Sequence, residues 1–167
     1  MNYRNSEDHL VDVRNAEEAE LDQLATLWQE AWNDAHAGIV PAELTRLRTW
    51  ESFRSRLKDA LPDVRVVGPS DQPLGFCIIK ADQLYQLFVS RSARGSGVAV
   101  ALIDDGEKRL ANNGVETAWL ACAIGNDRAA RFYEKRGWRR AGTVLSDAET
   151  SEGTFQLNVW RYEKSLA

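Results

Sequence analysis

Apolar and polar positions along this chain alternate with two different periods, and the longer period predicts helices. Between residues 16 and 33 the apolar residues recur at helical spacing, with glutamates in the first turn where the helix dipole favours negative charge. Pro41 suits the first turn of a second helix, which runs to residue 57 on an apolar stripe and ends before Pro62. Both segments therefore offer one apolar face to a core.

Shorter apolar runs predict strands. Residues 84–89 and 118–124 are almost continuously apolar, which is typical of strands buried on both faces. Helices are expected after each of them, at 98–112 and after Gly125, where Asn126 or Asp127 would cap the helix and Gly137 would end it. The remaining expected strands are 10–14, a hairpin of 64–68 and 74–80 around the turn 69–73, and a final pair, 140–146 and 154–162.

The order of these elements predicts a mixed α/β fold around one sheet, with about seven strands and four helices. The 167 residues amount to a single domain, and the chain contains no repeat or linker. The first nine residues are polar and are expected to fray. One compact domain with a real core is therefore predicted for residues 1–167.

Charge and composition narrow the classes of partner. A net charge of −4 and a pI near 5.3 argue against a nucleic-acid-binding surface and favour a small or cationic partner. No apolar run approaches the ~20 residues of a membrane span, so no membrane partner is expected. Cys77 and Cys122 lie in apolar runs and are expected to be buried, reduced thiols of a cytoplasmic protein. The sequence leaves the oligomeric state open, a homodimer included.

The segment after the strand at 84–89 has the chemistry of an anion site. Arg94-Gly95-Ser96-Gly97 leads into the helix at 98–112, whose first N–H groups lack partners and carry partial positive charge. Gly95 and Gly97 let a phosphate approach the backbone, and Arg91 and Arg94 add charge. We therefore expect a phosphorylated ligand at this turn.

Two other interpretations of these glycines exist. Residues 95–100 half-match a dinucleotide-binding fingerprint, but Val100 replaces the third glycine and the preceding chain lacks alternating βαβ units. The glycines could also form nothing more than a tight turn. A P-loop is excluded, because the sequence contains no G-x-x-x-x-G-K-[ST] pattern.

Two motifs together resemble one family. Residues 94–99 (Arg-Gly-Ser-Gly-Val-Ala) resemble the Q/R-x-x-G-x-G/A signature of the GNAT superfamily of N-acetyltransferases. Residues 126–138, from Asn-Asp-Arg-Ala to Arg-Gly-Trp, resemble that family's N-x-x-A-x-x-F-Y-x-x-x-G-F/W motif. The resemblance implies acetyl-CoA as co-substrate, no metal, and two central parallel strands, 84–89 and 118–124, that splay apart to admit CoA.

The resemblance also assigns residues to the cofactor. The backbone of 87–89 would pair with the pantetheine arm as an added strand does, and 94–100 would hold the pyrophosphate. Asn126 would contact the cofactor, or would simply cap its helix. The implied cofactor-binding residues are Leu87, Phe88, Val89, Arg94, Gly95, Ser96, Gly97, Val98, Ala99, Val100, Asn126 and Tyr133.

Two of these positions carry the implied chemistry. An amine attacks the thioester carbonyl, an oxyanion develops, and the CoA thiolate leaves. The backbone N–H of Leu87 is the candidate oxyanion donor, and Tyr133 matches the tyrosine that protonates the thiolate. The alternative for Tyr133 is an aromatic on a helix face whose hydroxyl bonds a backbone carbonyl.

The general base is where this sequence departs from the family pattern. Several relatives place a glutamate where Gln83 stands here, and an amide cannot accept a proton at neutral pH. Asp82 is adjacent but points to the opposite face of a strand. Water, Asp34, His36 or Glu43 remain, and no base is assigned.

The acceptor is expected between the first two helices and the last hairpin. Asp147, Glu149 and Glu152 would suit a cationic amine, or would simply be a solvated loop. Trp28, Trp32 and Trp50 would line a pocket for an apolar acceptor, or would belong to the core. The sequence leaves both pairs of alternatives open.

Two functions follow from these residues. The first is an N-acetyltransferase that moves the acetyl group of acetyl-CoA to a small-molecule, peptide or protein amine in a ternary complex. The second is a CoA-binding sensor or structural module without transferase activity. Tyr133 favours the first and Gln83 the second.

Overall fold

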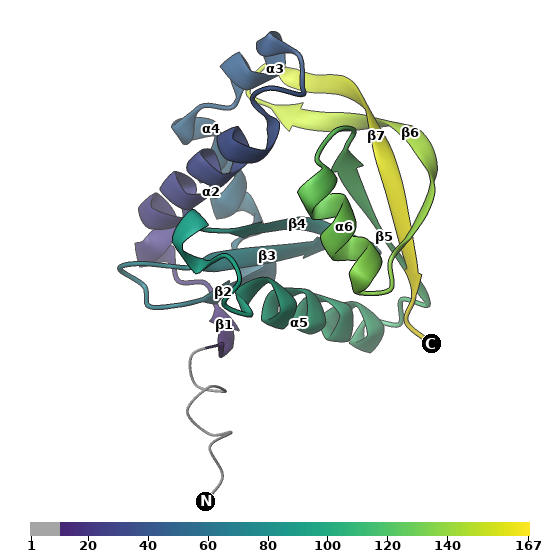
Figure 1. The fold of residues 1–167 in the computed structure, drawn as a ribbon. Coiled ribbons are helices and arrows are strands. Elements are labelled where there is room, and N and C mark those ends of the chain that lie inside the picture. Colours follow the sequence, from purple (N-terminus) through teal and green to yellow (C-terminus); the bar gives the residue numbers. More distant parts are fainter. Residues whose placement is uncertain (1–10) are drawn as a thin grey trace, which may run out of the picture.

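The computed structural model describes residues 11–167, and its centre is one mixed sheet of seven strands in the order β1-β2-β3-β4-β5-β7-β6 (Figure 1). Every neighbouring pair is antiparallel except β4 and β5. Residues 1–9, where fraying is predicted, lie outside the described residues, as does the first residue of the predicted strand 10–14. The strands are β1 (Val13–Asn15), β2 (Val64–Val67), β3 (Gly75–Lys80), β4 (Gln83–Val89), β5 (Thr117–Ala123), β6 (Arg139–Thr150) and β7 (Gly153–Ser165).

The described residues contain five α-helices where four are predicted. The predicted helix 41–57 is interrupted at Arg48, because Thr49 begins a new helix by accepting a hydrogen bond from the backbone N–H of Ser52 at 3.1 Å. The α-helices are α2 (Leu21–His36), α3 (Ala42–Leu47), α4 (Trp50–Ala60), α5 (Val98–Asn112) and α6 (Asp127–Lys135). Single 3-10 turns are η1 (Glu18–Glu20), η2 (Leu61–Asp63) and η3 (Arg91–Ala93).

The helices cover both faces of the sheet, and alternate residues of β3 show this division. Phe76 and Ile78 pack with α2 and α4 in one core cluster, whereas Cys77 and Ile79 pack with α5 in the other. Helix α5 lies very close to the sheet, since a Cβ at Gly106 would come within 2.7 Å of the Leu84 side chain. The prediction that both cysteines are buried is confirmed, and both are free thiols.

Strands β4 and β5 separate soon after they begin. Within residues 11–167, their register contains one pair, Gln83 with Trp119, although both strands continue for several residues. The prediction that residues 84–89 are buried on both faces is wrong: only Leu84 is buried in β4, and the residues after it are half-buried. The neighbouring strand has moved away from them, which leaves a gap in the middle of the sheet.

The last hairpin is longer than predicted. Strands β6 and β7 pair from Arg139 opposite Glu163 to Thr150 opposite Gly153, with a short turn between them. Asp147 and Glu149, expected in a loop, therefore lie in β6, and only Glu152 lies in the turn. Figure 1 shows the far end of this hairpin reaching across to α3.

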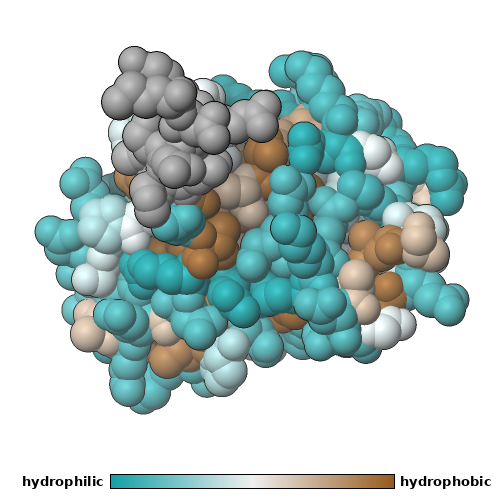
Figure 2. Space-filling view, turned by 90° about the horizontal axis from the view of Figure 1, so that it is seen from below, coloured by the Kyte–Doolittle hydropathy of each residue, from teal (hydrophilic) through white to brown (hydrophobic). Residues whose placement is uncertain are grey.

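The outer face on the side of α5 is mainly hydrophilic. Figure 2 shows this side of the molecule, where hydrophobic residues form small groups separated by polar ones. Within residues 11–167, no helix combines the length and the apolar composition needed to cross a membrane.

Candidate active site

The predicted anion site borders a cavity of about 810 Å³ between α2, β4, the turn before α5, and α6. Gly97 is the N-cap of α5 with φ of +87°, and Gly95 has φ of +78°, a left-handed conformation that favours glycine. Space for a ligand exists at both, since a Cβ on Gly95 would meet nothing within 4 Å and one on Gly97 only Val11 at 3.8 Å. The turn therefore presents backbone rather than side chains to the cavity.

Most of the predicted cofactor residues lie together around this cavity. Two do not line it: Val98 is buried in the core, and the Ser96 hydroxyl donates to the carbonyl of Ala93. Those that line it are Leu87, Phe88, Val89, Arg94, Gly95, Gly97, Ala99, Val100, Asn126 and Tyr133.

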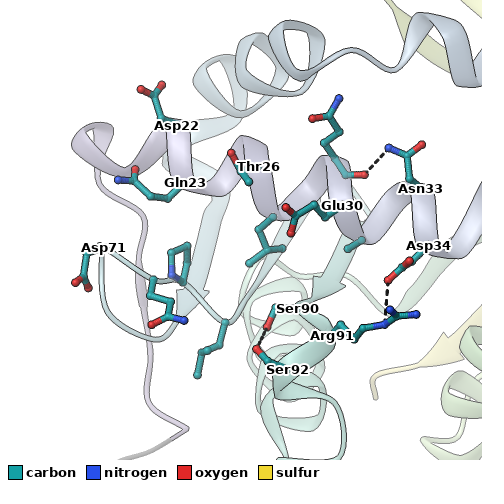
Figure 3. A pocket seen from close by; sticks show the side chains of 16 residues that line it. Asp22, Gln23, Thr26, Glu30, Asn33, Asp34, Asp71, Ser90, Arg91 and Ser92 are labelled. Atoms are coloured by element: carbon teal, nitrogen blue, oxygen red, sulfur yellow. Dashed lines mark hydrogen bonds and ion pairs between the residues drawn. The ribbon is translucent and has the colours of Figure 1, made fainter.

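Arginines stand at the mouth of this cavity, opposite one carboxylate. The Asp34 carboxylate on α2 lies 3.4 Å from Nη2 of Arg94 and 3.6 Å from Nε of Arg91. Figure 3 shows the Asp34–Arg91 pair from a neighbouring hollow of about 800 Å³, which lies between α2, the turn at 69–73 and residues 90–92. Asp34, predicted as a candidate base, is thus an ion-pair partner of the arginines near the glycine turn.

A second, smaller cavity of about 170 Å³ extends from the gap between β4 and β5 to α2, α3, α4 and β6. The two cavities share residues from β4 and from α6 with its N-cap, so they meet at the point where the strands part. The shared residues are Leu87, Phe88, Asn126, Ala129 and Tyr133.

Tyr133 faces this junction from α6. Its ring packs against Phe132 at 5.6 Å, Tyr162 at 6.2 Å and Trp138 at 6.4 Å between centroids. Its hydroxyl makes no hydrogen bond to any part of the chain that the structure describes, so the alternative of a bond to a backbone carbonyl is not observed. Burial raises the pKa of Tyr133, and the phenol therefore stays protonated at neutral pH.

Asn126 serves as the N-cap of α6 and also lines both cavities. Its side-chain oxygen accepts a hydrogen bond from the backbone N–H of Ala129 at 3.4 Å.

Cys122 lines the second cavity, but burial raises the pKa of its thiol to about 12. At neutral pH this thiol is protonated and is a poor nucleophile.

His36 is the candidate base that lines the second cavity. Its Nδ1 lies 3.1 Å from the carbonyl oxygen of Trp32, and its ring packs on Trp32 and Phe88 at 4.9 and 6.2 Å. Burial lowers the pKa of His36 to about 4, so the imidazole is neutral at pH 7. Because a carbonyl only accepts, Nδ1 carries the proton and Nε2 keeps its lone pair.

The other acid–base candidates are more dispersed. Gln83 lines the second cavity, whereas Asp82 accepts a hydrogen bond from the indole N–H of Trp119 at 2.9 Å. Glu43 is exposed on α3, 4.0 Å from Arg46, and lines neither cavity. Of the three tryptophans, Trp28 belongs to the core, Trp32 lines the second cavity, and Trp50 bonds Thr26.

Two arginines of the second cavity were not predicted from the sequence. Arg48 and Arg56 line it from the end of α3 and from α4. The available signal was their spacing: Arg48 follows Leu44 by four residues and Arg56 follows Phe53 by three, which places each charge beside a buried position.

Comparison with known proteins agrees with this geometry. The model of the acetyltransferase (GNAT) family matches residues 18–138. The peptidyl-lysine N-acetyltransferase YjaB of Escherichia coli is 26% identical over 136 residues, which cover 80% of this chain and 85% of YjaB.

Solved structures show the same fold. A GCN5-related N-acetyltransferase from Rhodopseudomonas palustris superposes with a TM-score of 0.73 at 20% identity, over 92% of this chain and 94% of that one. The PaiA N-acetyltransferase from Thermoplasma acidophilum, in complex with coenzyme A, gives 0.63 at 20% identity, over 92% and 98%. The family model matches most of the chain, and the two sequence motifs and the parted central strands agree with it. This chain therefore belongs to the GNAT family of acetyltransferases.

Proposed function

We propose that this protein transfers the acetyl group of acetyl-CoA to a primary amine of a small molecule, a peptide or a protein, by direct attack in a ternary complex. The observation that carries the proposal is the meeting of two cavities at the gap between β4 and β5, with Tyr133 lining both. Each substrate then has its own entrance, and the reacting groups meet where the strands part. YjaB, whose name specifies peptidyl-lysine, supports an amine as the acceptor.

The glycine turn fits the diphosphate of CoA. The free N–H groups at the start of α5 and the Cβ-free surface at Gly95 and Gly97 suit an anion that contacts backbone. Arg94 lies at the mouth of the same cavity and adds positive charge. We propose that residues 94–100 bind the diphosphate and that the half-buried segment 87–89 of β4 contacts the pantetheine arm.

The direction of the backbone in β4 supports the N–H of Leu87 as the oxyanion donor. The amide of Ser90 donates to the carbonyl of Leu74, on the β3 side, at 2.8 Å. Strand amides alternate in direction, so the N–H groups of Leu87 and Val89 would point to the other side, into the gap. A fixed amide dipole at that position would stabilise negative charge developing on the thioester oxygen.

Tyr133 is proposed as the acid that protonates the leaving thiolate. Its phenol is protonated at neutral pH, has no hydrogen-bond partner among residues 11–167, and lines the junction of the cavities. Burial disfavours the phenolate, so the proton donated must be recovered from the amine or from water. We assign no side chain as the base, since His36 is a weak base and Gln83 cannot accept a proton.

Release of CoA thiol from acetyl-CoA in the presence of a panel of amines tests the proposal. Amine-dependent release, with one N-acetylated product per thiol, is the expected result. The free thiols of Cys77 and Cys122 fit a reducing, cytoplasmic setting for this reaction.

A CoA-binding sensor or structural module is the second candidate, because Gln83 stands where the family resemblance implies a glutamate in several relatives. Tight CoA binding without thiol release for any amine would favour this module over the transferase.

A further inference from the structure

We propose that the acceptor is an amine that also carries an acidic group, and that Arg48 and Arg56 bind this group in the second cavity. The proposal rests on the proposed transferase function and specifies its acceptor. It differs from the expectation of a simple cationic amine attracted by acidic residues of the last hairpin.

Arg48 is a buried cation with unused donors. Only 7% of its surface is exposed, its Nη1 donates to the backbone carbonyl of Glu149, and its guanidinium lies 5.8 Å from the Trp32 ring centroid. Its Nε is buried without a hydrogen-bond partner. The bond to Glu149 and the Trp32 ring fix the guanidinium at the cavity wall, while other N–H groups stay free for a ligand.

Arg56 stands beside it and is held in the same way. Its guanidinium lies 4.4 Å from the Trp28 ring centroid, and its Nη2 donates to the Tyr85 hydroxyl at 3.1 Å. Its Nε is also buried and unpartnered. Two preorganised guanidinium groups with free N–H donors match the oxygen atoms of a carboxylate or a phosphate.

Among residues 11–167 the charge of these arginines is only partly balanced, although Asp147 and Glu149 line the same cavity. Neither Arg48 nor Arg56 forms an ion pair with a carboxylate within the described range 11–167. The Glu149 carboxylate attracts both arginines, but its ion pair is with Lys80 at 2.8 Å. Burial, and then repulsion from Arg56, lower the pKa of Arg48 to about 10. A buried cation without an ion-pair partner is costly, so an anionic ligand would be stabilised at Arg48.

The residues that line the two ends of the second cavity indicate how the acceptor would be oriented. Leu87 and Tyr133 line it at the gap in the sheet, and Arg48 and Arg56 line it on the side of α3 and α4. An acceptor bound with its acidic group at the arginines would extend its amine toward the gap. Free amino acids and amino phosphates have this pairing of groups, whereas a lysine side chain within a peptide does not.

Matched acceptors test the proposal by rate. The twenty amino acids are compared with their amides, phosphoethanolamine with ethanolamine, and both sets with a lysine peptide blocked at its two ends. The acidic member of the preferred pair should have a kcat/KM about 10- to 100-fold higher, as expected for charge-assisted hydrogen bonds. If the amino acids react faster than their amides, the acidic group of the acceptor is a carboxylate. If phosphoethanolamine reacts faster than ethanolamine, the acidic group is a phosphate.

Variants of the two arginines test whether they cause the preference for an acidic amine. Arg48→Gln and Arg56→Gln should each raise KM for the acidic amine about 10- to 100-fold, while KM for acetyl-CoA and for the neutral analogue stays unchanged. Arg46→Gln is the matched control, since Arg46 is exposed on α3 and lines neither cavity. If Arg48→Gln does not fold, Arg56→Gln, at a half-buried position, carries the test.

A binding measurement separates this inference from the proposed function. N-acetyl amino acids and their amides are titrated calorimetrically into the CoA-loaded protein, which requires no turnover. Tighter binding of the acids, lost in Arg48→Gln, supports the anion site even if no amine is acetylated. Equal binding of acids and amides together with equal rates within the ethanolamine pair overturns the inference and leaves the transferase function intact. Faster acetylation of the blocked lysine peptide, with no effect of either arginine variant, does the same.

Discussion

The two cavities that meet at the parted strands are built in opposite ways. The larger cavity, the proposed cofactor cavity, is formed largely by one continuous segment, residues 87–100, together with α6 and the residues just before it. The second cavity collects side chains from α2, α3, α4, β4, β5 and β6, which are far apart along the chain. The first uses backbone groups, glycines and exposed arginines, whereas the second uses buried or half-buried side chains such as Arg48 and His36.

This difference suggests which of the two sites the members of a family have in common and which one varies with the acceptor of each member. A backbone anion site depends on local conformation and tolerates many neighbouring residues, so it can persist while the rest of the chain changes. A site of dispersed side chains changes with each substitution that lines it. On the proposed assignment, the larger cavity would therefore indicate the reaction that the family shares, and the second cavity would indicate the acceptor.

Tyr133→Phe should have the largest effect, because Tyr133 lines both cavities and removal of its hydroxyl affects the step at their junction. We expect kcat to fall by about 10²- to 10⁴-fold, the usual range for loss of a general acid, with little change in CoA affinity. Steady-state kinetics and CoA titration measure the two effects. Tyr162→Phe is the control, since that hydroxyl bonds Arg140 and lines neither cavity. Full turnover by Tyr133→Phe would remove the assigned acid.

Gly97→Glu should weaken CoA binding without changing the second cavity. It places a carboxylate at the start of α5 and strains a residue at φ of +87°, and we expect CoA affinity to drop by at least about 100-fold. Wild-type protein with CoA at 100 times its Kd should gain about 2.7 kcal/mol, a Tm rise of roughly 5–10 °C that the variant loses. Gly97→Ala has the same backbone strain without the charge and should lose much less. Equal losses in both variants would mean that the anion site plays no part.

His36 offers a test of the second cavity through pH. Its pKa is about 4 in the folded protein and near 6.5 when unfolded, so the unfolded chain binds more protons between these values. This contribution is complete above pH 6.5 and is lost as the pH falls toward 4, on the order of 1–3 kcal/mol in the free energy of unfolding. His36→Gln should show a shallower loss, measured by urea unfolding at several pH values. Identical pH profiles for the two proteins would show that the imidazole is not desolvated.

Asp34→Asn should have the smallest effect, because its ion pairs with Arg91 and Arg94 are exposed at the rim of the cofactor cavity. We expect the free energy of unfolding to change by less than about 1 kcal/mol. CoA should bind slightly more tightly at low salt, since the arginines lose a competing anion, and the gain should vanish at high ionic strength. Weaker CoA binding would indicate that Asp34 orients the arginines rather than competing for them.

The sequence predicted those parts that depend on short stretches of chain. The element order, the glycine turn and the capped helix at Asn126 each follow from neighbouring residues, and the family assignment they supported is confirmed. The break at Thr49 was missed because a capping threonine within an apolar stripe leaves the helical period intact. The exposure of β4 could not be predicted, since an empty gap beside an apolar strand looks like a buried strand in the sequence. Arg48 was missed because its burial depends on β6, about a hundred residues away.

The single backbone pair between Gln83 and Trp119, within residues 11–167, has one more consequence. It leaves the central sheet with an unfilled place for one strand, and a bound pantetheine arm would fill it. Deuterium uptake at the amides of Leu87 and Val89 should therefore be fast in the empty protein and slow in the loaded one. Resistance to proteolysis should likewise be higher in the loaded protein. The lifetime of this protein would therefore depend on the local supply of its own acyl donor.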